Sequence, residues 1–137
     1  MKLRNFEVSS SIELQSGDSF WDLHNSASFD GLELHPKENL AVMRWSLPAA
    51  PDAKFSGIEL RFRGLQFLTA GLRDGELPLS EDTCVSYVLK VDPRVENDDP
   101  YLRQVFDLSD SFRLLFRFQS GRIIEVGSES VELISVG

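Results

Sequence analysis

The sequence is poor in the residues that most often carry chemistry. Its 137 residues include one cysteine and two histidines. The lone Cys84 excludes a disulfide within the chain, and a domain of this size without disulfides fits a reducing compartment. A metal site needs three or four converging ligands. His24 and His35, with only scattered carboxylates around them, are therefore expected to be structural or surface residues, and we expect no metal and no cofactor.

The common motifs of catalysis are also missing. There is no Gly-x-Ser-x-Gly elbow, and neither a Gly-x-Gly-x-x-Gly turn nor a Walker phosphate loop occurs. Cys84 lies in a strand-like segment, where a cysteine is usually a small apolar filler. Only a histidine brought beside it by the fold would make it a nucleophile candidate. We assign no catalytic residue, and the sequence leans against an enzyme.

Long apolar runs and positive charge are scarce as well. No run approaches the roughly 18 residues that span a bilayer, and residues 1–5 begin with charge rather than with a signal-peptide pattern. The formal net charge is −8, whereas nucleic acids and anionic membranes attract basic surfaces. We therefore expect a cytoplasmic protein that binds neither nucleic acid nor membrane, and whose acidity suits a basic protein partner.

What the sequence does contain is the two-residue alternation of half-buried strands. The alternation is clearest over 57–69, where Gly64 marks a slip of the apolar phase, before Leu65 and Phe67, that a β-bulge would absorb. Further strands are predicted at 6–14 (one strand, or two broken near residues 9–11), 83–91, 112–118, 122–126 and 131–136, with a hairpin over 31–47. Turns at 120–121 and 127–130 predict an antiparallel meander at the end of the chain.

Two segments fit short helices. Asp18 or Ser19 suits the N-cap of a helical turn that reaches residue 23, and Asp99-Pro100 is a typical helix start before the apolar residues of 102–108. The chain is predicted to be a single, mostly β domain over 1–137. Its architecture is an antiparallel sandwich or a half-open barrel of about seven or eight strands, with one or two short helices.

Negative charge is concentrated in residues 74–110, which hold ten acidic and three basic residues. Its densest part is Glu96-Asn97-Asp98-Asp99, which is either a solvated loop or a docking surface, because complementary charge speeds protein encounter. We take four residues as partner-binding candidates: Asp92, Glu96, Asp98 and Asp99. Four arginines on polar strand faces favour cross-strand salt bridges over an anion-binding patch; they are Arg61, Arg63, Arg113 and Arg117.

Three stretches resemble a group of small bacterial β-proteins, some of which are regarded as immunity proteins of contact-dependent or polymorphic toxin systems. They are Leu23-His24-Asn25-Ser26, Leu60-Arg61-Phe62-Arg63-Gly64-Leu65, and the strand, glycine turn and returning strand of 116–125. Asn25 stands where that group often has aspartate. The resemblance implies a non-enzymatic cytoplasmic domain that binds and neutralises a toxin.

Three functions remain open from the sequence. The leading hypothesis is a non-enzymatic binding domain, in its most concrete form an immunity-type protein that docks a basic partner through the acidic 92–99 loop. The first alternative is a small-molecule-binding β-barrel or an enzyme whose site forms only in the fold, with His24, His35 and Cys84 as candidates. The second alternative is a homo-oligomeric structural component.

Overall fold

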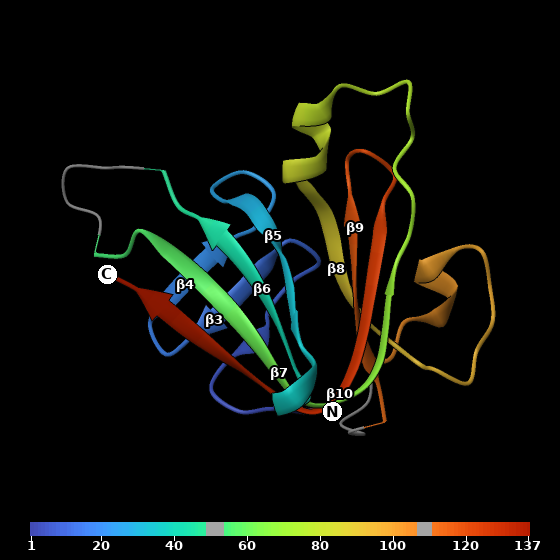
Figure 1. Cartoon of the computed structure of the whole chain (residues 1–137), viewed down its shortest axis with the longest axis horizontal. Helices are drawn as coiled ribbons and strands as arrows, with labels where there is room; N and C mark the ends of the chain where they lie inside the picture. Colours follow the sequence, from blue (N-terminus) through green and yellow to red (C-terminus); the bar gives the residue numbers. More distant parts are fainter. Residues whose placement is uncertain (49–53, 107–110) are drawn as a thin grey trace.

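The main body of the protein is a curled antiparallel sheet that forms a half-barrel (Figure 1). The computed structural model describes residues 1–48, 54–106 and 111–137. The sheet runs in the order β5 (Ser28–His35), β6 (Leu40–Ser46), β7 (Gly57–Ala70), β10 (Ile123–Val136), β9 (Arg113–Phe118) and β8 (Val85–Val91). Its seventh strand, β1 (Lys2–Leu3), pairs with β10. The predicted mostly β, half-open barrel is confirmed.

A second sheet of three short strands packs against the same core. It consists of β2 (Glu7–Val8), β3 (Glu13–Ser16) and β4 (Ser19–Asp22), so the 6–14 segment is broken at its serines. Leu14 and Trp21 lie opposite each other in β3 and β4 and join the core that contains Phe116. The helical turn predicted over 18–23 is therefore wrong, because the β3–β4 pairing buries Trp21 beside Leu14.

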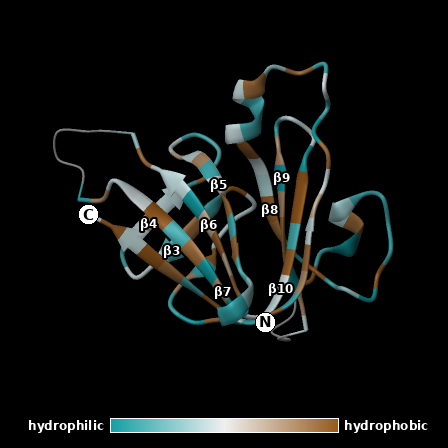
Figure 2. Cartoon of the chain, viewed as in Figure 1, coloured by the Kyte–Doolittle hydropathy of each residue, from teal (hydrophilic) through white to brown (hydrophobic). Residues whose placement is uncertain are grey.

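The alternation of side chains places one face of the main sheet in the core and the other outside. Figure 2 shows the resulting alternation of hydrophilic and hydrophobic residues along β6 and β7. Ile58, Leu60 and Phe62 of β7 are fully buried. The 31–47 hairpin is confirmed, since β5 and β6 pair around the 3-10 turn η1 (Pro36–Glu38). This alternation is the reason that the sequence predicted these strands.

The long β7–β10 pair is irregular near its middle. Gly64 has a φ of +66°, the left-handed region that side chains with a Cβ rarely occupy. The register shifts so that Gly127 pairs with Phe67 and Ser128 with Leu65, which makes Gln66 the extra residue. A bulge is present as predicted, but its extra residue lies two positions beyond Gly64.

The shift separates the two apolar residues that follow Gly64. Leu65 packs against the main core. Phe67 instead lies beside the guanidinium group of Arg113, which is 3.6 Å from the centre of the phenyl ring. The sequence predicted that Leu65 and Phe67 lie on the same face of the sheet. This is wrong for Phe67, because the extra residue Gln66 lies between them and interrupts the alternation of side chains.

β10 is one continuous strand rather than the two strands predicted at 122–126 and 131–136. The small residues at 127–130 reflect close packing instead of a turn. A Cβ on Gly127 would lie 3.2 Å from the side chain of Arg113, tighter than ordinary contact. β10 changes its neighbour along its length: 123–126 pair with β9, whereas 130–131 pair in parallel with β1.

Candidate functional site

Residues 92–106, here called the flap, lie against the outer side of β8 and carry all four partner-binding candidates. A small apolar cluster of Leu89, Val91 and Leu115 occupies this side of the sheet, apart from the main core. Backbone hydrogen bonds close the flap on itself and on β8: Asp92 N donates to Arg103 O (2.8 Å), and Val105 N donates to Lys90 O (2.9 Å). The flap is therefore fixed to the sheet at both of its ends.

A buried ion pair fixes the flap to the central strand. Arg103 donates to both carboxylate oxygens of Glu125, at 2.6 and 3.1 Å, and its Nε donates to Val95 O (2.9 Å). Arg113 donates a further hydrogen bond to Glu125 (3.1 Å). Burial alone would raise the pKa of Glu125, but the two guanidinium groups outweigh it and hold that pKa below its ordinary value. Glu125 is therefore a carboxylate at neutral pH.

The middle of the flap is a 3-10 turn, η3 (Pro100–Arg103), where the sequence predicted a short helix. The carboxylate of Asp99 accepts a hydrogen bond from Tyr101 N (3.0 Å) and so caps this turn, as the Asp-Pro pattern predicted. Pro100 is buried, and the ring of Tyr101 lies 4.7 Å from that of Tyr87 on β8. Residues 107–108 of the predicted helix lie outside the described residues.

The four acidic candidates divide into two pairs. Asp92 accepts hydrogen bonds from the guanidinium group and the backbone N–H of Arg94, which lower its pKa. Asp92 and Asp99 thus shape the flap. Glu96 and Asp98 are exposed, and neither has a hydrogen-bond or ion-pair partner among the described residues. These two carboxylates remain available to a partner.

Apolar side chains stand exposed in the same flap. Tyr101, Leu102 and Phe106 are 50%, 65% and 85% exposed. The sequence did not predict this surface, because the helical spacing of Leu102 and Phe106 indicated only a short helix. The described structure contains only the 3-10 turn there. Rigid aromatic and large apolar groups beside charges are the usual composition of protein-binding surfaces.

The remaining acidic residues of 74–110 are placed differently. β8 separates the flap from the 71–84 connection, which contains Asp74, Glu76, Glu81 and Asp82. Asp82 forms an ion pair with Arg73, whose Nε donates a hydrogen bond to the Asp82 carboxylate (2.9 Å). Asp107 and Asp110 lie outside the described residues. The predicted acidic stretch is thus two surfaces at the two ends of one strand.

The fold brings together two of the three residues of the alternative site, His24 and Cys84. Cys84 Sγ lies 3.6 Å from His24 Nδ1 and 3.4 Å from the backbone oxygen of His24. His24 Nδ1 also lies 2.8 Å from Val85 O. A carbonyl oxygen can only accept a hydrogen bond. Nδ1 of His24 therefore carries the ring proton and donates a hydrogen bond to Val85 O. It cannot then act as the base that removes the thiol proton.

The electrostatics of this pair also oppose a reactive thiolate. Burial raises the pKa of the Cys84 thiol, and the nearby carboxylates of Glu81 and Asp22 raise it further, whereas a nucleophilic cysteine needs a lowered pKa. Asp22 accepts hydrogen bonds from His24 N (2.9 Å) and Asn25 N (2.8 Å) and forms the turn after β4. The contact between His24 and Cys84 therefore connects the small sheet to β8.

His35 and the arginines on the polar strand faces take part in surface pairing. His35 Nε2 lies 3.2 Å from a carboxylate oxygen of Glu33. Three of the four arginines bind carboxylates: Arg61 with Glu59, Arg63 with Glu132, and Arg113 with Glu125. The fourth, Arg117, lies opposite Tyr87 of β8. The predicted cross-strand salt bridges are present for Arg63 and Arg113, whereas Arg61 pairs with Glu59 of its own strand, β7.

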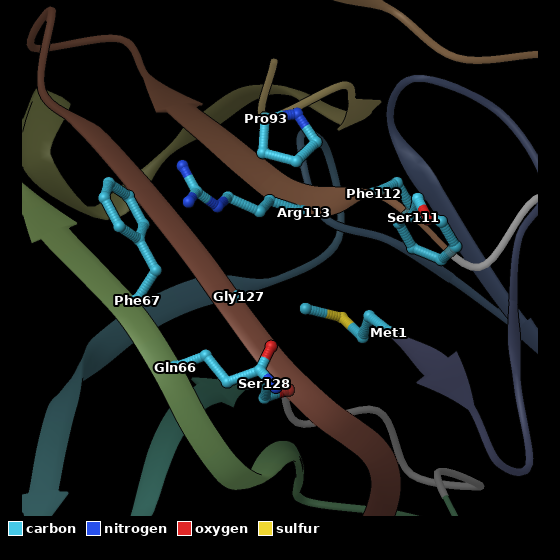
Figure 3. A pocket seen from close by; sticks show the side chains of 9 residues that line it. All are labelled: Met1, Gln66, Phe67, Pro93, Ser111, Phe112, Arg113, Gly127 and Ser128. Carbon is cyan, nitrogen blue, oxygen red and sulfur yellow. The ribbon is translucent and has the colours of Figure 1, made fainter.

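The interior of the half-barrel is filled by aromatic side chains. Phe62, Phe116 and Phe118 are buried, and Trp45 packs against Phe116 at 5.7 Å between ring centres. A pocket of about 290 Å³ lies outside this core, at the gap between β9 and β1 along β10. Figure 3 shows Arg113 reaching toward Phe67 on one side of this pocket, with Met1 across from them.

A second pocket of about 320 Å³ lies at the small sheet, between Phe20 and Phe55. None of His24, His35 and Cys84 lines either pocket. Among the described residues no group of three or more His, Cys, Asp or Glu side chains is arranged to hold a metal ion. Within the same residues, no helix has the length and apolar character needed to cross a membrane. No protein-family model, curated protein or solved structure matches this chain.

Proposed function

We propose that this chain is a non-enzymatic binding domain that docks a basic protein through its flap. The observation that carries the proposal is the pair of exposed carboxylates, Glu96 and Asp98, which have no partner in the described part of the chain and lie on a segment fixed by the buried Arg103–Glu125 pair. A fixed segment loses little conformational freedom on binding, so more of the contact energy contributes to affinity.

The flap combines two kinds of contact. Its carboxylates attract a basic surface and speed the encounter. The apolar side chains of Tyr101, Leu102 and Phe106 would be buried against the partner, and removing their surface from water stabilises the complex. Aromatic residues of this kind dominate binding energies at protein interfaces. The resemblance to immunity proteins supports a specific form of the proposal, in which the partner is a toxin protein with a basic surface.

Charge reversal with a matched control tests the proposal. The probe is the protein that the wild-type chain captures from an extract of its own source organism, purified and titrated at several salt concentrations. We expect Glu96→Lys with Asp98→Lys to weaken binding about tenfold or more and to flatten the dependence of affinity on salt. The fold should persist, since neither side chain has a partner among the described residues.

The control carries the same change of net charge elsewhere. Glu7→Lys with Glu38→Lys reverses two exposed carboxylates on β2 and η1 and should leave both affinity and salt dependence near wild-type values. If the flap variant and this control bind alike, the flap is not the docking surface and the proposal is wrong.

A further inference from the structure

The connection between β7 and β8 exposes a second set of apolar side chains. Residues 71–79, here called the leucine loop, lead into η2 (Leu79–Thr83) at the start of β8 (Figure 1). Within nine residues the loop exposes Leu72 (93%), Leu79 (74%) and, less fully, Leu77. A single exposed leucine is ordinary, but a group of them in one short segment marks an interaction site.

The loop holds its leucines outward because its one arginine is bonded inward. Arg73 donates from NH2 to Leu77 O (2.6 Å) and Pro78 O (2.9 Å), and from Nε to Asp82 (2.9 Å). These three bonds draw 77–78 and the start of η2 back to residue 73. The leucines on either side of these bonded groups therefore belong to a segment that is held in one conformation.

Backbone hydrogen bonds attach the loop to the turn between β9 and β10. Gly71 N donates to Ile123 O (2.8 Å), and Asp74 N donates to Ser120 O (2.7 Å). In return, Ser120 N donates to Glu81 O (3.1 Å). A loop bonded in this way is ordered before it meets a partner, which reduces the entropy lost on binding.

The charges around the leucines indicate the kind of partner. Asp74 and Glu76 are exposed, whereas Arg73 is largely covered and is paired with Asp82. Within 71–79 the exposed charges are thus all negative. The loop repeats the composition of the flap, with large apolar side chains beside carboxylates, and it is complementary to an apolar patch with a basic rim.

The leucine loop and the flap lie at the two ends of β8. Seven residues of strand span roughly 23 Å, and a protein interface of ordinary size covers about 800 Å² on each partner, or roughly 30 Å across. We propose that the leucine loop is a second contact surface for the same basic protein that the flap docks. This inference rests on the proposed function, because it takes the flap's partner as its occupant.

The test removes the apolar contact without changing charge. The probe is the captured partner described above, titrated against Leu72→Ser with Leu79→Ser. We expect affinity to fall about tenfold, as for truncation of interface anchors, with the salt dependence unchanged. Leu34→Ser, at another exposed leucine on β5, is the matched control and should bind like the wild type. Unchanged melting temperatures would show that all variants fold.

The outcomes separate the two proposals. If the leucine variant binds like the control while the flap variant is weakened, the leucine loop is not a contact surface and the flap proposal stands. If the leucine variant is weakened while the flap variant is not, the flap proposal is wrong and the leucine loop alone binds the partner. Weakening of both, with only the flap variant changing the salt dependence, supports the inference.

Discussion

Arg103 and Glu125 meet through two nitrogen–oxygen contacts of 2.6 and 3.1 Å although 22 positions separate them in the chain. Their side chains are only 14% and 8% exposed. The contact connects the flap, which we propose binds a partner, to β10, the strand that pairs with β7, β9 and β1. The orientation of the flap therefore depends on one carboxylate in the middle of the sheet.

Replacing that carboxylate is expected to destabilise the protein. Glu125→Gln removes the charge that neutralises Arg103 and Arg113, and removing one partner of a buried ion pair costs about 3–5 kcal/mol of unfolding free energy. Glu132→Gln is the matched control, because it makes the same change on the same strand in a surface pair with Arg63; it should cost less than about 1 kcal/mol. Urea unfolding monitored by tryptophan fluorescence measures both. Equal losses would contradict the structural role of Glu125.

The same carboxylates set the response to acid. Hydrogen bonds from Arg44 lower the pKa of Glu59 despite partial burial, and the pKa of Glu125 is lowered despite the opposing effect of burial. A group whose pKa is lower in the folded state stabilises the fold above its unfolded value, 4.5 for these residues, and loses that contribution as the pH falls through the folded value. The unfolding free energy should therefore decrease from about pH 5 downward.

Glu125→Gln provides the check on this acid response. The variant lacks the titrating group, so its stability should decline less steeply than that of the wild type over the same acidic range. Urea unfolding at a series of pH values gives both slopes. Parallel slopes would mean that Glu125 contributes nothing to the acid response.

A side chain at Gly64 is expected to destabilise the protein. Its φ is +66°, and a Cβ would lie 2.6 Å from the Cδ atom of Glu129. Gly64→Ala should lower the unfolding free energy by about 1–3 kcal/mol. Gly75→Ala is the control, since nothing lies within 4 Å of its Cβ position, and it should change stability by less than about 1 kcal/mol. Adding Glu129→Ala to Gly64→Ala should recover only the part of the loss that is due to the clash.

Periodicity predicted the elements that are half buried along a clear face. β6, β9 and the first half of β7 each place alternate residues in the core, so their sequences alternate. In β8 a register shift between Val85 and Tyr87 interrupts this pattern, and Leu89 and Val91 belong to the outer cluster. β4 was not predicted, because its Ser-Phe-Trp-Asp sequence also fits a capped helical turn. Only the pairing with β3, which buries Trp21, shows that this segment is a strand and not a helical turn. β10 was divided in two because Gly127 and Ser128 suggest a turn, whereas Gly127 is small to make room for Arg113.

The candidate site was predictable in its charge and not in its shape. The density of carboxylates at 96–99 is visible in the sequence, and Asp99 before Pro100 indicates a cap. Which carboxylates stay free depends on contacts such as Arg94 with Asp92. The exposure of Leu102 and Phe106 could not be predicted, because their spacing is that of a helix. The pairing of Arg103 with Glu125 joins distant segments, and no local pattern indicates it.

The place of β10 in the sheet has a consequence for biosynthesis. β10 is translated after β7, β9 and β1, all of which pair with it, so the ribosome releases its central strand later than the strands around it. Until β10 emerges, β7 and β9 present unpaired edges of the kind that promote aggregation, and closing contacts such as Asn5 with Leu133 span 128 positions. Pairings this distant fold slowly, so the edges of β7 and β9 stay unpaired for longer than the edges of strands that pair with near neighbours in the chain.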